Sequence, residues 1–175
     1  MVRDKVKVVF LDRDGVINRK AAEHDYVKRP EEFQLLEGSA KAIRLLNHQG
    51  YKVIIVTNQR GIARKLMTEA DLTNIHEKMQ QDLAAEGAFV DKIYYCPHDI
   101  IENCSCRKPK TGMLLQAEAQ YPVDKSLSFM VGDSMSDIQA GVSFGVNSIL
   151  IGEAAGPIPY AADLFTAVRE LIIKE

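Results

Sequence analysis

Two aspartates, Asp12 and Asp14, stand one residue apart beside Gly15 and directly after an apolar run. Carboxylate oxygens are ligands that Mg²⁺ prefers, and a bound divalent cation offsets the repulsion between an anionic nucleophile and a phosphate ester. One carboxylate can then attack phosphorus and form an aspartyl-phosphate, while the other protonates the leaving oxygen and later activates water. The pair therefore predicts phosphoryl transfer, with Asp12 as nucleophile and Asp14 as general acid and base.

Two other structures would place aspartates in a similar pattern. A strand can end in a solvated acidic turn, and these residues alone do not exclude that interpretation. A calcium-binding loop that begins at Asp12 fits less well, because Val16 and Ile17 would take its fifth and sixth positions. Those two positions need a ligand and a glycine.

The elements that must position the carboxylates alternate along the chain. The apolar run 8–11 predicts a strand that is buried on both faces. Further strands are predicted over 52–56, 92–95, 128–131 and 147–151, and helices over 38–50, 68–87, 112–120, 135–144 and 162–173. This alternation predicts an α/β, Rossmann-like fold of three layers, with a parallel sheet of about five strands and helices on both faces.

Polar residues follow four of the predicted strands. Asp12 follows the first strand, residues 57–59 the second, Cys96 the third and Asp133 the fourth. Parallel strands bring their carboxyl ends to one edge of a sheet, where open α/β folds bind ligands. We therefore expect the Thr57 hydroxyl to bind phosphate oxygens, and Asp133 to add a carboxylate to a Mg²⁺ that Asp12 holds. At Thr57, an ordinary strand-end turn is the alternative.

Three further features have more than one interpretation. Asp137 lies one helical turn after Asp133, where it either orients the metal ligands or is an acid favoured by a helix N-terminus. Segment 16–33 is polar and without a period, and long loops of this kind are usually functional or disordered, so we expect it to lie over the site. His48 and His76 fall on predicted helices, where we expect structural roles.

All three cysteines fall in one short stretch with a histidine: Cys96, His98, Cys104 and Cys106. Three thiolates and one imidazole within eleven residues form the ligand set of a tetrahedral Zn²⁺ site. A disulfide is the alternative, and the odd number of cysteines opposes it. Because four protein ligands leave no open position, we expect the zinc to be structural and to fold the loop 96–106.

Two cations, Arg107 and Lys108, follow the last of these ligands. We expect the zinc loop to aim both at the phosphate site. Lys108 would neutralise the phosphoryl group and the nucleophile, and the planar fork of Arg107 would grip phosphate or hydroxyl oxygens. A solvated basic pair is the alternative.

The composition of the chain limits the remaining function classes. Its 175 residues, 46% of them hydrophobic, suffice for one domain with a core. A net charge of −2 gives no basic footprint for nucleic acid, and no apolar run approaches the roughly 20 residues that span a bilayer. The first residues show no signal-peptide apolar segment, and the cysteine usage favours a reducing compartment, so we expect a cytoplasmic monomer.

At the level of motifs, the chain resembles the haloacid dehalogenase (HAD) superfamily. The match covers nearly the whole chain and consists of Asp12-Arg13-Asp14-Gly15, Thr57-Asn58-Gln59, Lys108 and Gly132-Asp133. The resemblance implies a Mg²⁺-dependent phosphatase in which Asp12 is nucleophile and metal ligand. It also implies that Asp14 is the acid and base, with a backbone carbonyl that reaches the metal. Thr57 and Lys108 would stabilise the phosphoryl group, and Asp133 would complete the metal site.

Within the superfamily, the chain is most similar to the heptose bisphosphate phosphatases. The similarity rests on the residues of 10–15, 57–59, 61–64, 94–98, 104–109 and 112–115. It implies removal of the 7-phosphate of D-glycero-D-manno-heptose 1,7-bisphosphate, a structural role for the zinc ligands, and substrate contacts from Arg107. The resemblance also implies substrate contacts from the loop residues Glu23, His24, Asp25 and Tyr26, and we expect further contacts from Asn58, Gln59 and Arg60.

Two departures from that family bear on the substrate. Arg60 stands where better-known members carry a small residue, and Ser134 where some members have a lysine. Histidinol-phosphate phosphatases share the aspartate pair, the zinc loop and the Arg107-Lys108-Pro109 sequence, so histidinol phosphate is the alternative substrate. DNA 3′-phosphatases also belong nearby, but this acidic chain lacks the positive track that their substrate needs.

The gaps between the motifs are too short for the cap domain that many HAD phosphatases carry. We therefore predict one capless domain over 1–175, with the 16–33 loop and the zinc loop as walls of the pocket. Two alternatives belong to other classes. A receiver-like phosphorylation switch would end its middle strand in a phosphoacceptor aspartate and not in Thr57, and the intact Asp12 and Asp14 oppose a non-catalytic zinc-stabilised binding module.

Overall fold

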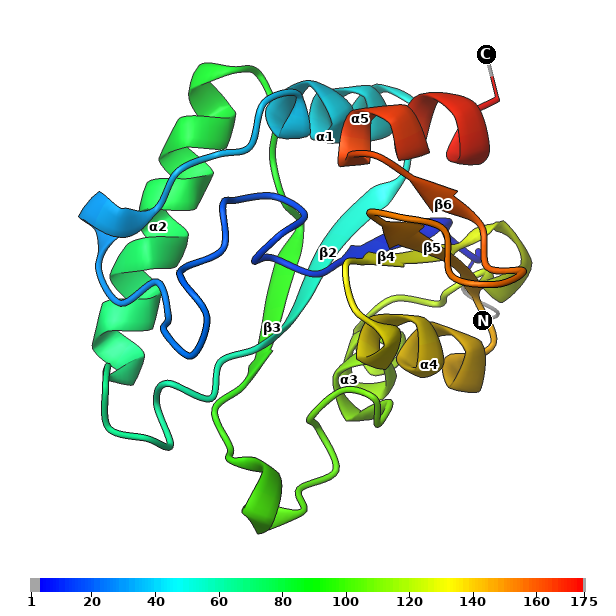
Figure 1. Cartoon of the computed structure of the whole chain (residues 1–175). Helices are drawn as coiled ribbons and strands as arrows, with labels where there is room; N and C mark the ends of the chain where they lie inside the picture. The colour runs from blue at the N-terminus through cyan, green and yellow to red at the C-terminus, as the bar shows by residue number, and fades with distance from the viewer. Residues whose placement is uncertain (1–3, 175) are drawn as a thin grey trace.

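A computed structural model describes residues 4–174 (Figure 1). Its strands form one parallel sheet in the order β3-β2-β1-β4-β5-β6. They are β1 (Val8–Leu11), β2 (Lys52–Asn58), β3 (Lys92–Cys96), β4 (Phe129–Gly132), β5 (Asn147–Ile151) and β6 (Tyr160–Ala161). This confirms the parallel α/β fold. Residues 1–3, which enter the expectation that no signal segment precedes the first strand, lie outside the described residues.

The sheet has one strand more than the five that the apolar runs predict. Strand β6 is two residues long and pairs Tyr160 with Leu150 and Ala161 with Ile151. A strand of this length shows no alternation and no apolar run, so only its pairing with β5 identifies it.

Four of the five predicted helices are confirmed within a few residues at either end. They are α1 (Ser39–His48), α2 (Glu69–Ala85), α3 (Gly112–Gln120) and α4 (Met135–Phe144). The fifth differs: a single α-helical turn, α5 (Leu164–Thr166), continues as a π-helix over Ala167–Ile172. Short 3₁₀ turns lie at Pro30–Glu32, Ile100–Glu102 and Lys125–Leu127. None of the helices within 4–174 is long and apolar enough to cross a membrane.

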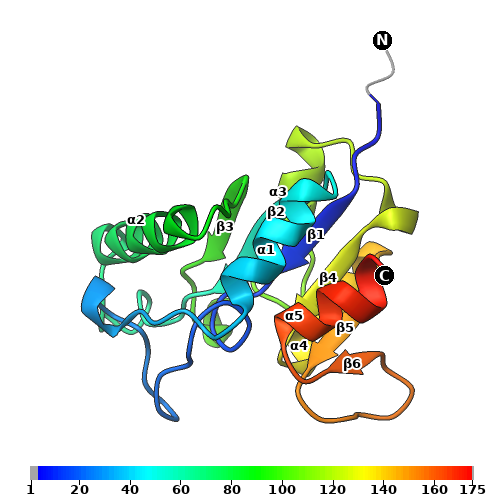
Figure 2. The same cartoon turned by 90° about the horizontal axis from the view of Figure 1, so that it is seen from above.

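The two faces of the sheet bury separate cores, and Figure 2 shows the helices on either side. Alternate residues of β1 divide between them: Val9 and Leu11 face α1, α2 and the C-terminal helix, whereas Val8 and Phe10 face α3 and α4. Phe10 packs edge-on against Phe144 of α4, with ring centroids 5.8 Å apart. Since both faces are covered, β1 and residues 53–56 of β2 are apolar at every position, as is usual in parallel sheets.

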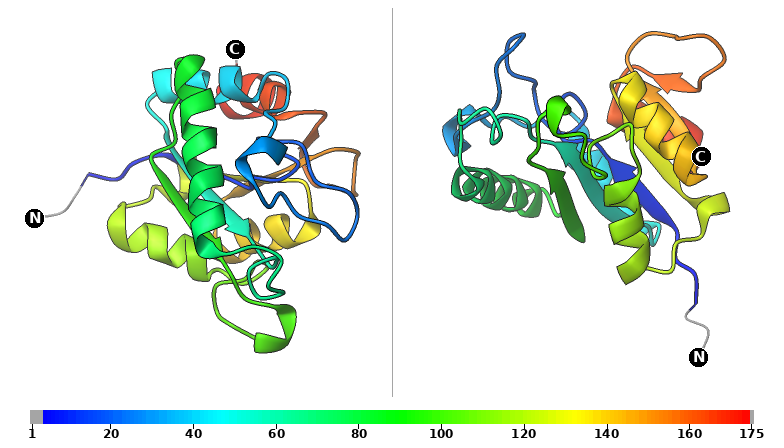
Figure 3. Two further views of the ribbon diagram at one scale, coloured as in Figure 1. Left: turned by 90° about the vertical axis from the view of Figure 1, so that its left-hand side faces the viewer. Right: turned by 90° about the horizontal axis from the view of Figure 1, so that it is seen from below.

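The long loops emerge at the carboxyl edge of the sheet, as Figure 3 shows. Between β1 and α1 the chain forms a loop and one 3₁₀ turn, and between β3 and α3 it forms the zinc loop with another. Neither insertion within residues 4–174 folds into a cap, so the pocket walls come from loops. The rigid sheet positions the strand ends, and the loops lie above them.

Helix α4 packs unusually close to the sheet, and Gly141 permits this. A Cβ at position 141 would collide with the side chains of Ser148 and Met130. In an exposed helix interior, glycine to alanine stabilises by about 1 kcal/mol, but overpacking a core costs about 1–3 kcal/mol. We therefore expect Gly141→Ala to lower the free energy of unfolding, in urea titrations followed by circular dichroism.

The neighbouring Val142, 66% exposed on the same helix, supplies the control. Val142→Ala should change the stability by less than about 0.5 kcal/mol. If Gly141→Ala instead raised the stability, the close contact between α4 and the sheet would be wrong.

Candidate active site

Three of the four polar strand ends predicted to meet line one cavity, of about 500 Å³, and Cys96 at the end of β3 does not. Asp12 and Asp14 come from the end of β1, Asn58 from β2, and Asp133 from the residue after β4. The other lining residues are Lys20, Ala21, Ala22, Glu23, His24, Asp25, Tyr26, Val27, Lys108, Ser134, Ser136 and Asp137. Among the predicted catalytic and substrate-binding residues, Thr57, Gln59, Arg60 and Arg107 do not line it.

Lys108 lies at the centre of the cavity floor, with a side chain only 2% exposed. Its Nζ donates to Asp12 Oδ1 at 3.0 Å and to the Val56 carbonyl at 2.6 Å, and it lies 2.6 Å from Asp137 Oδ1. The side-chain amide of Asn58 bonds both the N–H and the carbonyl of Lys108, so Asn58 holds this residue in place. A single buried ammonium thus joins two carboxylates from different strand ends.

The electrostatics of this cluster leave negative charge in excess. Burial, together with the nearby Asp137 and Asp14, raises the pKa of Asp12 to about 7, although Lys108 acts in the opposite direction. Burial would lower the pKa of Lys108, but Asp12 and Asp137 outweigh it and raise that pKa. Lys108 is therefore charged, and one positive group is shared among more than one carboxylate.

This carboxylate set fits a hard divalent cation. Carboxylate oxygens of Asp12, Asp133 and Asp137 lie within 4.8 Å of one another. Asp137 Oδ1 is buried and has no hydrogen-bond partner within residues 4–174 apart from its ion pair. Oxygen ligands at this spacing suit Mg²⁺. A Cβ at position 15 would collide with Asp133, so Gly15 permits the two loops to approach.

Asp14 has a different environment from Asp12. Its Oδ1 accepts from Arg13 and from Asn18 Nδ2 at 2.9 Å, and its Oδ2 accepts from Arg13 and from Gln59 Nε2 at 3.0 Å. Burial alone would raise the pKa of Asp14, but Arg13 and the hydrogen bonds outweigh burial and lower it. The two aspartates thus have opposite pKa shifts, because Arg13 and the amide donors surround Asp14 and not Asp12.

Thr57 and Gln59 lie beneath the site and not on its surface. Thr57 is 1% exposed, and its Oγ1 accepts from Gln59 Nε2 at 2.9 Å. The same amide donates to Asp14. In this structure Gln59 therefore connects the end of β2 to Asp14, and its predicted contact with substrate stays a prediction.

Segment 16–33 supplies the outer wall, through Glu23, His24, Asp25 and Tyr26. Glu23 and His24 are almost fully exposed, with side chains 89% and 87% accessible. Lys20 from the same segment reaches down and pairs with Asp133, 2.5 Å away. The sequence signals did not single out Lys20, because its role depends on how the loop folds back.

The two arginines assigned to substrate lie elsewhere. Arg60 pairs with Asp99 of the zinc loop at 2.8 Å, which ties that loop to the turn after β2. Arg107 has a buried Nη1 with no hydrogen-bond partner within the described chain. The structure thus gives Arg60 a bracing contact, and leaves the substrate roles of both as predictions.

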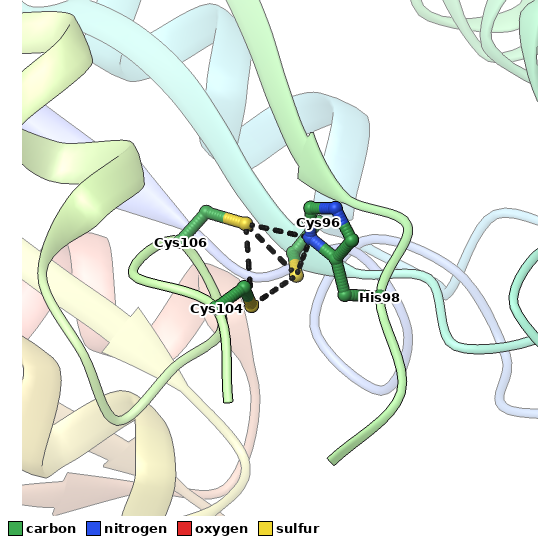
Figure 4. Close-up of side chains that lie close together, drawn as sticks. All are labelled: Cys96, His98, Cys104 and Cys106. Atoms are coloured by element: carbon green, nitrogen blue, oxygen red, sulfur yellow. Dashed lines mark hydrogen bonds between the residues drawn. The ribbon is translucent and has the colours of Figure 1, made fainter. Parts of the chain in front are cut away.

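The predicted zinc ligands do converge, as Figure 4 shows. His98 Nδ1 lies 3.2 Å from Cys106 Sγ and 3.6 Å from Cys96 Sγ. The three sulfurs lie 3.1–3.6 Å apart, too far for a disulfide. Metal–sulfur bonds of about 2.3 Å in a tetrahedron require separations of about 3.7 Å, close to these values. All four residues thus fit a closed metal site.

The contact between Arg13 and His76 is one that the sequence did not predict. Arg13 is completely buried and bonds Asp14, and its Nη1 lies 3.2 Å from His76 Nε2. Asn18 also contacts Asp14, and these two residues are only four positions apart in the sequence. No local pattern joins residues 13 and 76, because helix α2 brings them together.

The buried imidazole predicts how stability depends on pH. Burial and then Arg13 lower the pKa of His76 to about 3, against an ordinary value of 6.5. Between these values the unfolded state binds more protons, so stability falls as the pH falls. Each pH unit in this window costs about 1.4 kcal/mol. We expect the free energy of unfolding to fall between pH 7 and about 4.5 in both proteins. In urea titrations, this decrease should be smaller in His76→Gln than in wild type, by on the order of 2 kcal/mol. Equal losses would contradict the buried neutral histidine.

Comparisons with known proteins agree with this geometry. The chain matches the family model described as polynucleotide kinase 3 phosphatase over residues 7–159. It is 40% identical over 158 residues to D-glycero-beta-D-manno-heptose-1,7-bisphosphate 7-phosphatase of Pasteurella multocida, with 87% of this chain and 84% of that enzyme covered. It is 40% identical over 147 residues to the D-glycero-alpha-D-manno-heptose enzyme of Campylobacter jejuni, with 84% and 83% covered.

A solved structure is similarly close. The D,D-heptose 1,7-bisphosphate phosphatase of B. bronchiseptica, crystallised with magnesium and phosphate, superposes with a TM-score of 0.89 at 35% identity. That superposition covers 97% of this chain and 100% of the other. These matches bear out the resemblance drawn from the motifs. The chain belongs to the polynucleotide kinase 3 phosphatase family, among the heptose bisphosphate phosphatases of the HAD superfamily.

Proposed function

We propose that this protein is a phosphoric monoester hydrolase that removes the 7-phosphate of D-glycero-D-manno-heptose 1,7-bisphosphate. The observation that carries the reaction class is the pair Asp12 and Asp14 in one cavity with Lys108, whose Nζ lies 3.0 Å from Asp12 Oδ1. Relatives named for this activity, at about 40% identity, support the substrate. These relatives carry both anomeric names, so the anomer is an outcome of the test.

The chain's own groups account for two in-line steps. Both hydrogen bonds to the Asp12 side chain within 4–174 end on Oδ1, which leaves Oδ2 free to attack phosphorus. Asp14 then protonates the departing sugar oxygen, and the aspartyl-phosphate on Asp12 is hydrolysed by water that Asp14 deprotonates. Lys108 neutralises charge on the phosphoryl group throughout.

We propose Mg²⁺ as the catalytic cofactor, held by Asp12, Asp133 and the Asp14 backbone carbonyl, with Asp137 next to them. When bound, it supplies charge neutralisation between the nucleophile and the phosphoryl oxygens. The carboxylate oxygens of Asp12, Asp133 and Asp137, which lie within 4.8 Å of one another, support this assignment, and the related B. bronchiseptica enzyme was crystallised with magnesium.

The remaining assignments concern the outer site and the setting. We propose that the pocket segment Glu23–Tyr26 and residues Asn58, Gln59, Arg60 and Arg107 contribute to substrate recognition, and that Thr57 stabilises the phosphoryl group. The chain would act as one capless domain over 1–175 and as a monomer. Three free, clustered cysteines support a cytoplasmic setting.

A substrate panel with excess Mg²⁺ tests this function. The panel holds both anomers of the heptose bisphosphate, histidinol phosphate and a 3′-phosphorylated oligonucleotide. We expect one heptose anomer to give a kcat/KM at least about tenfold above the other substrates. Asp12→Asn should reduce phosphate release by at least about 10³-fold, because it removes the nucleophile.

Ser136→Ala, at the rim of the same pocket, is the matched control for correct folding. Preference for histidinol phosphate would overturn the substrate assignment but retain the mechanism. Absence of turnover, with stable phosphate trapped on Asp12, would favour the phosphorylation-switch alternative.

We further propose that Zn²⁺ occupies the site of Cys96, His98, Cys104 and Cys106 and is structural. The loop 96–106 contains little that could form a core of its own, so metal binding would supply its folding energy. Plasma mass spectrometry should find about one zinc per chain in wild type and almost none in Cys104→Ser. The thermal unfolding temperature of that variant should be lower than that of wild type by more than about 5 °C.

Ser105→Ala is the control on the same loop, because this exposed side chain is not a ligand. It should retain the metal and the unfolding temperature. Zinc-free wild type with unchanged thermal unfolding would refute the structural role.

A further inference from the structure

Arg13 stands between the two aspartates and is the largest side chain that the fold buries completely. A guanidinium leaves water at a high cost unless acceptors satisfy its N–H groups. The Asp14 carboxylate accepts from Nε at 3.3 Å and from Nη2 at 3.0 and 3.1 Å. The third nitrogen, Nη1, lies 3.2 Å from His76 Nε2. Each nitrogen of Arg13 therefore has a partner.

His76 is the partner that comes from outside the catalytic edge of the sheet. It lies near the middle of α2, where Leu72, Ile75 and Met79 are buried in the core. Because Nη1 can only donate, His76 Nε2 must accept, and the neutral ring then carries its proton on Nδ1. The low pKa of His76, caused by burial and then by Arg13, agrees with this form. A packed helix thus presents a fixed acceptor to Arg13.

We propose that His76 is a positioning residue for the general acid: through Nη1 it sets the plane of the Arg13 guanidinium, and Arg13 in turn orients the Asp14 carboxylate. This inference rests on the proposed function, in which Asp14 protonates the leaving oxygen. Because a guanidinium is planar, an acceptor at Nη1 and a carboxylate across Nε and Nη2 together fix its rotation.

The surroundings of Asp14 show why the orientation needs support from this side. Asn18 holds Oδ1 from the following loop, and Gln59 holds Oδ2 from the end of β2. The Asp14 side chain remains 25% exposed, toward the cavity that it lines. Arg13 bonds both oxygens from the buried side, so rotation of its guanidinium would tilt the carboxylate relative to the leaving oxygen. Misplacement of a catalytic group by about 1 Å can cost 10²-fold.

Leaving-group dependence separates this role from simple packing. A sugar alkoxide needs a proton as it departs, whereas p-nitrophenolate leaves as a stable anion and needs little acid assistance. The kcat/KM reports steps up to the first irreversible one, which here is phosphoryl transfer to Asp12. A misplaced Asp14 should therefore slow the sugar phosphate more than p-nitrophenyl phosphate. A general packing defect would slow both alike.

The experiment compares His76→Leu and His76→Gln with wild type on the heptose bisphosphate and on p-nitrophenyl phosphate, with saturating Mg²⁺. We expect His76→Leu, which has no acceptor, to lower kcat/KM for the sugar phosphate about tenfold and for the aryl phosphate less than about twofold. His76→Gln places an amide oxygen near Nη1 and should recover most of the sugar-phosphate activity. Thermal unfolding of each variant shows whether it is folded.

The matched control is His48→Leu, the same substitution at an exposed site on α1. It should leave both activities unchanged. Equal losses on the two substrates in His76→Leu, or no loss at all, would overturn the positioning role. If His76→Leu does not fold, His76→Gln and Arg13→Lys provide the test. Arg13→Lys removes the planar guanidinium, so it must also slow the sugar phosphate more than p-nitrophenyl phosphate. Inactive wild type would instead refute the proposed function.

Discussion

The site depends on one buried ammonium group. Lys108 Nζ contacts carboxylates that follow two different strands, Asp12 after β1 and Asp137 on the helix after β4. Without it, two buried carboxylates would face each other at a short distance, and removal of one partner from a buried ion pair typically costs about 3–5 kcal/mol. The position of Lys108 therefore has to be secured, and much of the neighbouring structure does this.

The zinc loop and the turn after β2 cooperate in that task. Asn58 bonds the N–H and the carbonyl of Lys108, and the cluster of Cys96, His98, Cys104 and Cys106 ends two residues before it. Arg60 joins the same loop to the turn through Asp99. A loop without a core of its own is thus attached to the sheet at several points. These attachments hold the Lys108 ammonium at the cavity.

The two aspartates acquire different properties from their different neighbours. Burial dominates at Asp12 and raises its pKa, whereas Arg13 and two amide donors lower that of Asp14. A divalent cation and Lys108 would keep Asp12 anionic for attack, while the donors around Asp14 determine where its carboxylate points. The same residue type, two positions apart, thus has different properties at each position because the fold surrounds each differently.

The sequence by itself determined the reaction class and five of the six strands of the sheet, and it predicted the ligand sets, because these depend on local signals. Apolar runs mark the five longer strands, the aspartate pair marks the edge where chemistry occurs, and the spacing of Cys96 to Cys106 marks a metal loop. Only the tertiary structure decided the contacts between distant segments. Strand β6 is too short to show a pattern, Arg60 finds Asp99, and α2 brings His76 to Arg13 across 63 positions. Such pairs depend on how helices and loops pack onto the sheet, and no local periodicity encodes that packing.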